Sequence, residues 1–197
     1  MGLGRLLSGL GLGWVWLGLC AGLVGLPQVA AQQAGNGAAG EKPKLQAAAL
    51  GQTKNVHLFG KTLLCGQPTA EEFAQAKARG IAVVITLREP SEIDWDERQV
   101  VEKLGLKFHQ LSFSSAETLT DAVLDQSLQL LAKSAQQPVL LHCGSANRVG
   151  AIWAAHRVLN DGLEMEDALE EAKEVGLRIP ALADKVQDYV RRKQTKP

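Results

Sequence analysis

His142-Cys-Gly-Ser-Ala-Asn-Arg-Val-Gly150 lies between an apolar run and a helical pattern. The run before it, 138–141, is short and aliphatic, as expected for a strand that is buried on both faces of a parallel sheet. After it, apolar side chains recur at helical spacing as far as Leu159, and Asn-Asp-Gly at 160–162 stops the pattern. The stretch is therefore predicted to be a strand–loop–helix turn.

Such a turn can form a cradle for an anion. The backbone N–H groups of the loop and of the first helical turn point to one place, where the helix dipole adds partial positive charge. A thiol there, at Cys143, should lose its proton easily and act as a nucleophile. Arg148 would clamp the anion with its fork of donors. The residues predicted to line the bound anion are Gly144, Ser145, Ala146, Asn147 and Val149.

Strands and helices alternate outside this turn. We expect strands at 56–59, 62–65, 81–87, 107–111 and 138–142, and helices at 69–79, 94–104, 121–134, 149–159, 164–175 and 181–194. Right-handed crossovers then give an α/β fold, in which a mostly parallel sheet is covered by helices on both faces.

Several polar segments follow strands of this sheet. Ligands of such sheets bind beyond the carboxyl ends of the strands. The rule brings Gly66-Gln67-Pro68, Arg88-Glu89, the loop 112–117 and the Cys143 loop to one edge. Arg88 is a candidate ligand for the anion, and a solvated loop arginine is the alternative interpretation.

Three motifs carry a resemblance to a known family. In order and spacing, Gly66-Gln67-Pro68, Ile85-Thr-Leu-Arg88 and the Cys143 loop are similar to the bacterial cysteine-dependent dual-specificity and tyrosine phosphatase-like proteins of the beta-lactamase hydrolase-like type. Members of that family tend to have Gly-Gln-Pro, Val-Ile-Asn-Leu-Arg and His-Cys-x-Ser-Gly-Asn-Arg. The commoner phosphatase loop has five residues between Cys and Arg, whereas four stand here.

The resemblance implies a fold and an activity. The fold would have three layers, with a central mostly parallel sheet flanked by helices. The activity would be hydrolysis of phosphomonoesters through a phosphocysteine, without a cofactor. Substrates would be proteins that carry phosphotyrosine, phosphoserine or phosphothreonine, or small phosphate esters. The resemblance also implies that His142 tunes the acidity of Cys143, and a satisfied core histidine is the alternative.

This sequence departs from the phosphatase pattern at three places. The loop 112–120 lacks the usual general acid Asp, which leaves Glu117 as the candidate and Asp121 as the second choice. Val149 has no hydroxyl to help the thiolate depart in the second step. Ala146 replaces a Gly where a positive φ is needed in related loops. The expected activity is therefore slow, atypical or lost.

Two other functions fit the same loop. A rhodanese-like sulfurtransferase would carry a persulfide on Cys143, and its loop has the same four-residue spacing. A catalytically weak phosphate-binding module would need neither a general acid nor a hydroxyl at position 149. The upstream Gly-Gln-Pro and Thr-Leu-Arg motifs favour the phosphatase.

The composition bears on which ligands and partners the protein can bind. The chain has 21 basic and 21 acidic residues, so no charge excess predicts nucleic-acid binding. His and Cys residues lack metal-ligand spacing, and no metal is expected. Cys65 and Cys143 are the two cysteines outside the N-terminal segment 1–50. Cys65 is either an inert thiol or a redox partner of Cys143.

The N-terminus resembles a targeting segment. Arg5 precedes the apolar stretch Leu6–Val24, and Val29-Ala-Ala31 provides small residues for cleavage. We expect a signal peptide at 1–31, a flexible leader at 32–50 and a phosphatase-like domain at 51–197. The protein would then be exported to the periplasm or beyond the cell, and an uncleaved segment would anchor it to a membrane.

Overall fold

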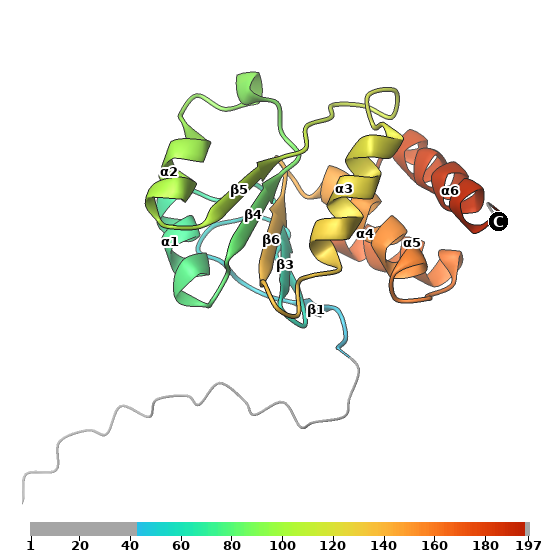
Figure 1. Ribbon diagram of the computed structural model, residues 1–197, viewed down its shortest axis with the longest axis horizontal. Coiled ribbons are helices and arrows are strands. Elements are labelled where there is room, and N and C mark those ends of the chain that lie inside the picture. The colour runs from blue at the N-terminus through green and yellow to red at the C-terminus, as the bar shows by residue number, and fades with distance from the viewer. Residues whose placement is uncertain (1–42, 196–197) are drawn as a thin grey trace, which may run out of the picture. The chain divides into compact units, whose positions relative to one another are not determined.

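The computed structural model describes residues 43–195, which contain a six-stranded sheet (Figure 1). The strand order is β1-β2-β3-β6-β4-β5. Strands β3, β6, β4 and β5 run parallel. Strand β2 pairs antiparallel with β3, and β1 pairs antiparallel with β2 at the edge of the sheet. The strands are β1 (Gln46–Ala47), β2 (His57–Phe59), β3 (Thr62–Cys65), β4 (Val83–Thr86), β5 (Lys107–Gln110) and β6 (Val139–His142).

Helices cover both faces of the sheet, which confirms the predicted α/β layers. Helices α1 and α2 lie on one face and α3 to α6 on the other (Figure 1). The helical elements are α1 (Ala70–Ala78), the 3₁₀ turn η1 (Pro90–Glu92), α2 (Glu97–Lys103), α3 (Asp121–Leu131), α4 (Asn147–Leu159), α5 (Met165–Val175) and α6 (Pro180–Gln194).

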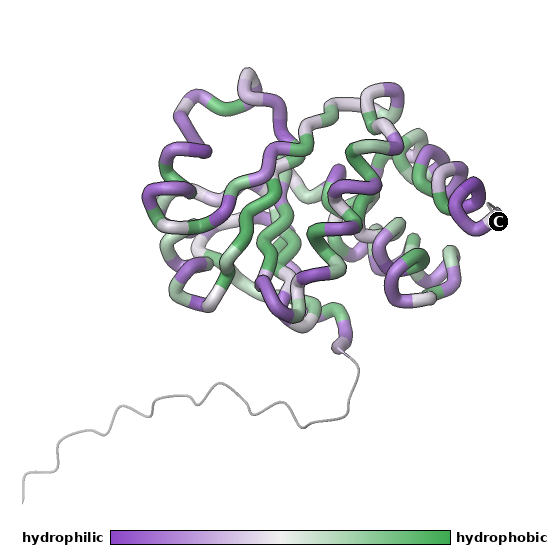
Figure 2. Tube along the Cα trace, in the orientation of Figure 1, coloured by the Kyte–Doolittle hydropathy of each residue, from purple (hydrophilic) through white to green (hydrophobic). Residues whose placement is uncertain are grey.

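Strand β6 lies at the centre of the parallel part. In its register, Leu140 lies between Leu63 of β3 and Val84 of β4. All four residues of β6 are buried, and the central strands are among the most hydrophobic segments of the chain (Figure 2). A strand that is apolar on both faces is stable only between two helical layers, so β6 and the loop after it hold a fixed position.

Helix α4 is packed against both α5 and α6. Most of its 13 residues are buried, which explains why its sequence is apolar almost all round. Gly150 allows the closest approach, because a Cβ atom there would lie 2.6 Å from the carbonyl oxygen of Ala172 in α5. The α5–α6 connection is thereby brought beside the first turn of α4.

The folded domain begins earlier than the sequence suggested. We expected a flexible leader as far as Leu50, but β1 pairs with β2, and Leu50 is fully buried. An edge strand needs backbone hydrogen bonds rather than a side-chain pattern, and Leu50, with the partly buried Leu45 and Ala48, packs the segment against the core. Residues 1–42, with the expected signal peptide and most of the leader, lie outside the described residues. No helix within 43–195 has the length and apolar character needed to cross a membrane.

Candidate active site

The Cys143 loop lies where the strand-end rule places it. Cys143 directly follows β6, and its N–H donates to the carbonyl of Cys65 at the end of the neighbouring strand β3, at 3.4 Å. The residue is 1% exposed. Helix α4 begins four residues later at Asn147, so the loop connects the carboxyl end of the central strand to a helix N-terminus.

The turn of this loop is made at Ala146. Its φ of 67° lies in the left-handed region, as the comparison with glycine-containing loops predicted. That conformation costs an alanine about 1–2 kcal/mol, so packing must hold it. Ala146 is fully buried, and a Cβ atom on Gly176 would lie 3.2 Å from it. Only a glycine lets the α5–α6 connection approach this closely.

Two connections hold the outside of the loop. The side-chain amide of Asn55 donates to the carbonyl of Ser145 at 2.8 Å, and Asn147 Oδ1 accepts from the backbone N–H of Arg178 at 3.1 Å. Nothing lies within 4 Å of the position where Gly144 would carry a Cβ atom. Val149, predicted to line the anion, directs its side chain into the core and is fully buried.

Two backbone carbonyls and one carboxylate hold the guanidinium of Arg148 from one side. Its Nη1 donates to the carbonyls of Leu87 (2.9 Å) and Phe113 (2.7 Å) and to Glu92 Oε1 (2.8 Å), while Nη2 donates to Glu92 Oε2 (2.6 Å). A guanidinium has five N–H donors. These contacts leave Nε and one Nη2 hydrogen as a free two-donor edge, which matches two oxygens of a phosphate.

Arg148 also lies close enough to Cys143 for the two groups to interact. Burial opposes the positive charge, but Glu92 and Cys143 outweigh it and hold the pKa of Arg148 above its usual value. Cys143 and Arg148 therefore lie close together, which the predicted roles of nucleophile and anion clamp require; the roles themselves stay predictions.

Glu92 is a site residue that the sequence analysis missed. It lies in η1, and its carboxylate forms the bidentate ion pair with Arg148. The hydrogen bond from Arg148 lowers the pKa of Glu92 to about 2. The available signal was its position in the loop that follows β4, next to Arg88 at the binding edge.

A second carboxylate holds His142. Glu97 Oε1 lies 2.9 Å from His142 Nε2, and these side chains are 3% and 0% exposed. Burial raises the pKa of Glu97, but hydrogen bonds from His142 and Gln67 outweigh that effect and leave it below the usual value. His142 thus has an ionised partner inside the protein, which fits a histidine that tunes Cys143.

Arg88 uses two of its nitrogens in hydrogen bonds within the protein, and its buried Nε has no hydrogen-bond partner in the described part of the chain. Its Nη1 donates to Gln67 Oε1 at 2.7 Å, its Nη2 donates to the carbonyl of Glu92, and Nε lies 3.5 Å from Glu92 Oε2. The predicted role of Arg88 as an anion ligand would use its remaining N–H groups, and it stays a prediction.

Glu117 lies in the loop before α3 and is exposed. A hydrogen bond with Ser115 lowers its pKa. A general acid at neutral pH needs a raised pKa instead, so its surroundings do not favour the predicted role. The contact of this loop with the site runs through the carbonyl of Phe113, which accepts from Arg148.

The side chains of Cys65 and Cys143 pack on opposite faces of the sheet. Both thiols are free and buried, but Cys65 packs in the cluster on the α1/α2 face, and Cys143 packs on the α3–α6 face. Because the sheet separates the side chains, a disulfide between them would require the strand ends to rearrange. The geometry favours the inert-thiol interpretation of Cys65.

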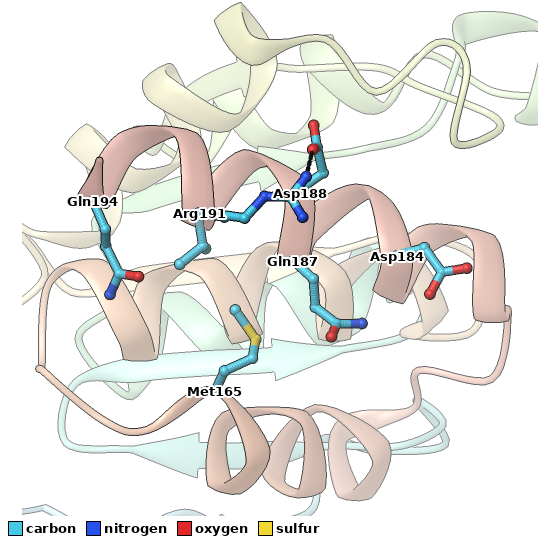
Figure 3. A pocket seen from close by; sticks show the side chains of 7 residues that line it. Met165, Asp184, Gln187, Asp188, Arg191 and Gln194 are labelled. Carbon is cyan, nitrogen blue, oxygen red and sulfur yellow. Dashed lines mark hydrogen bonds and ion pairs between the residues drawn. The ribbon is translucent and has the colours of Figure 1, made fainter. Parts of the chain in front are cut away.

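Other hollows lie away from the loop. One between the start of α5 and the outer face of α6 is lined by Met165, Gln187 and Arg191 among others (Figure 3). Its lining residues belong to α5 and α6 and include none from 142–150. Within residues 43–195, no three His, Cys, Asp or Glu side chains gather as a metal site requires.

Solved structures show what the chain is similar to. No protein-family model and no curated protein matches it. P. aeruginosa TpbA, solved as a Cys-to-Ser variant with pTyr, superposes with a TM-score of 0.62 at 22% identity, covering 78% of this chain and 96% of that one. The chain has the fold of the cysteine-dependent phosphatases.

Two further structures have the same fold. Tk-PTP in its active form gives a TM-score of 0.58 at 20% identity, covering 68% of this chain and 93% of that one. Kinase associated phosphatase, with its catalytic-site cysteine replaced by serine, gives 0.62 at 13% identity, covering 71% and 89%.

Glu92→Gln should destabilise the protein in a pH-dependent way. The pKa of Glu92 lies at about 2 in the folded state instead of 4.5, so its ion pair stabilises the fold fully above pH 4.5 and is lost as pH falls to about 2. In urea unfolding, the variant should therefore be less stable near neutral pH, with the difference shrinking below pH 4.5.

Glu102→Gln is the matched control for this experiment. Glu102 forms an exposed pair with Arg98 and should contribute little at any pH. A Glu92→Gln deficit that stays constant between neutral and acidic pH would contradict the assigned ion pair.

Proposed function

We propose that this protein is a cysteine-dependent phosphatase that hydrolyses phosphomonoesters. The observation that carries the proposal is the closeness of Cys143 and Arg148 at a helix N-terminus. A thiolate, two charged donors and a row of backbone N–H groups in one buried cradle suit a phosphoryl group.

The chemistry follows from this arrangement in two steps. In the first, the Cys143 thiolate attacks phosphorus, the P–O bond to the leaving group breaks, and Arg148 with the loop N–H groups holds the non-bridging oxygens. In the second, water attacks the phosphocysteine, the S–P bond breaks, and inorganic phosphate leaves with the thiolate restored. The oxidation states do not change, and one water is consumed.

The departures from the usual loop favour particular substrates. With Glu117 exposed and its pKa lowered, the leaving group must depart with little help from an acid. Phenolate is a better leaving group than an alkoxide, because phenols have a pKa near 10. Aryl phosphates, including phosphotyrosine in a protein, are therefore the favoured substrates over phosphoserine or phosphothreonine.

A phosphate-binding module is the second candidate. It is favoured by the exposure of Glu117 and by the burial of Val149, which has no hydroxyl to offer the thiolate. This function predicts anion binding without turnover. The sulfurtransferase alternative has no comparable observation in its favour, and the three structures described above are phosphatases.

The test is hydrolysis of an aryl phosphate by the purified protein without added metal. Cys143→Ser should abolish turnover, and Arg148→Lys should lower kcat/KM about 100-fold or more, because a single ammonium cannot replace the two-donor edge. Arg157→Lys is the matched control, since Arg157 lies on the same helix but pairs with Glu171 and Asp161.

Two results would count against a phosphatase that uses Cys143. Full turnover by Cys143→Ser would exclude the nucleophile. Phosphate binding by the unmodified protein without turnover of any aryl ester would favour the binding module.

We also propose that the protein is exported. The support is the sequence alone: the apolar stretch Leu6–Val24 followed by the small residues Val29-Ala-Ala31. N-terminal sequencing of protein from its native cell should find a start near Gln32. A retained Met1 in a cytoplasmic fraction would contradict export, whereas a retained Met1 in a membrane fraction would indicate an uncleaved anchor.

A further inference from the structure

Two pairs of hydrogen-bonded side chains flank the Cys143 loop. His142, the residue before Cys143, pairs with Glu97 inside the protein, where both side chains are 3% exposed or less. Arg148, at the end of the loop, pairs with Glu92 at a partly exposed position. The first pair lies next to the nucleophile, and the second holds the anion clamp.

Two further side chains connect these pairs. Gln67 Nε2 donates to Glu97 Oε2 at 2.8 Å, and Gln67 Oε1 accepts from Arg88 Nη1 at 2.7 Å. On its other side, Arg88 Nη2 donates to the carbonyl of Glu92, and Nε lies 3.5 Å from Glu92 Oε2. A polar path therefore runs from the buried histidine to the clamp, in which the link from Arg88 to the Glu92 carboxylate is an ion pair at 3.5 Å rather than a hydrogen bond.

The amide of Gln67 is fully committed in this path. Its nitrogen donates to Glu97 and to the carbonyl of Pro68 at 3.0 Å, and its oxygen accepts from Arg88. A glutamate at position 67 would lose the donor to Glu97, and a leucine would provide neither partner. The connection thus depends on a side chain that has a donor and an acceptor at one end.

The path also joins segments that are distant in the sequence. Gln67 follows β3, Arg88 follows β4, and His142 ends β6. These are the three strand ends whose motifs carried the family resemblance. In a buried polar network, each bond polarises its neighbours, and changes at two members are not additive.

We propose that Gln67 and Arg88 are positioning residues that form a bridge, through which the Glu97–His142 pair and the Glu92–Arg148 pair set the anion affinity of the Cys143 loop together. Arg88 then acts through Glu92 and does not bind substrate. The inference rests on the proposed function, because it assumes that the loop binds a phosphoryl group.

The test is a double-mutant cycle on the affinity for inorganic phosphate, measured from the dependence of the melting temperature on phosphate concentration. Glu92→Gln, Glu97→Gln and the double variant are compared with the unmodified chain. Through the bridge, the effect of one substitution on Kd should differ about threefold or more according to whether the other is present.

The same cycle is then repeated in a Gln67→Leu background, where the two substitutions should become additive. Gln110→Leu is the matched control, since Gln110 donates to the backbone carbonyl of Arg88 and leaves its guanidinium in place. Coupling should persist in that background. If Gln67→Leu does not fold, Arg88→Lys replaces it, because one ammonium cannot contact Gln67 and Glu92 as a fork does.

Additivity in the unmodified chain, or coupling that survives both Gln67→Leu and Arg88→Lys, would overturn the bridge. These outcomes are separate from the proposed function, because the readout is binding and not turnover. Coupling in a chain without turnover would support the bridge and overturn only the phosphatase. Additivity in an active phosphatase would overturn only the bridge.

Discussion

The contact between Arg148 and Glu92 is the interaction on which the binding edge depends. Leu87 and Phe113 also restrain the guanidinium of Arg148, because their backbone carbonyls accept hydrogen bonds from Nη1. The loops after β4 and β5 are thereby tied to the first turn of α4. Because these contacts take one side of the arginine, its position beside Cys143 is fixed before any substrate arrives. Such preorganised donors are the largest contribution to catalysis in many enzymes.

Local sequence patterns predicted the positions of Cys143 and Arg148 but not the carboxylates that hold the side chains around them. The apolar run at β6 and the helical spacing of α4 placed Cys143 and Arg148, because burial on two faces and a strand–loop–helix turn leave clear signals. Glu92 and Glu97 gave no such signal. Both are acidic residues outside an apolar pattern. The partner of Glu92 is 56 residues away in the chain, and the partner of Glu97 is 45 residues away. The edge strand β1 was not predicted for a similar reason, since both of its residues are exposed and leave no apolar pattern in the sequence.

The site is better equipped for the first chemical step than for the second. Attack on phosphorus needs the thiolate, the loop and Arg148, all of which converge. Release of phosphate needs water activated near the phosphocysteine and a thiolate that departs readily. The buried Val149 offers no hydroxyl for that purpose. This imbalance predicts that the phosphocysteine accumulates during turnover.

Trapping this intermediate is the most direct test of the central claim. The protein would be mixed with an excess of an aryl phosphate, quenched in acid within the first turnovers and analysed by intact and peptide mass spectrometry. The account predicts one added phosphoryl group per chain, located on Cys143. A phosphoryl group on another residue, or phosphate release at full rate from a protein in which Cys143 never carries one, would contradict it.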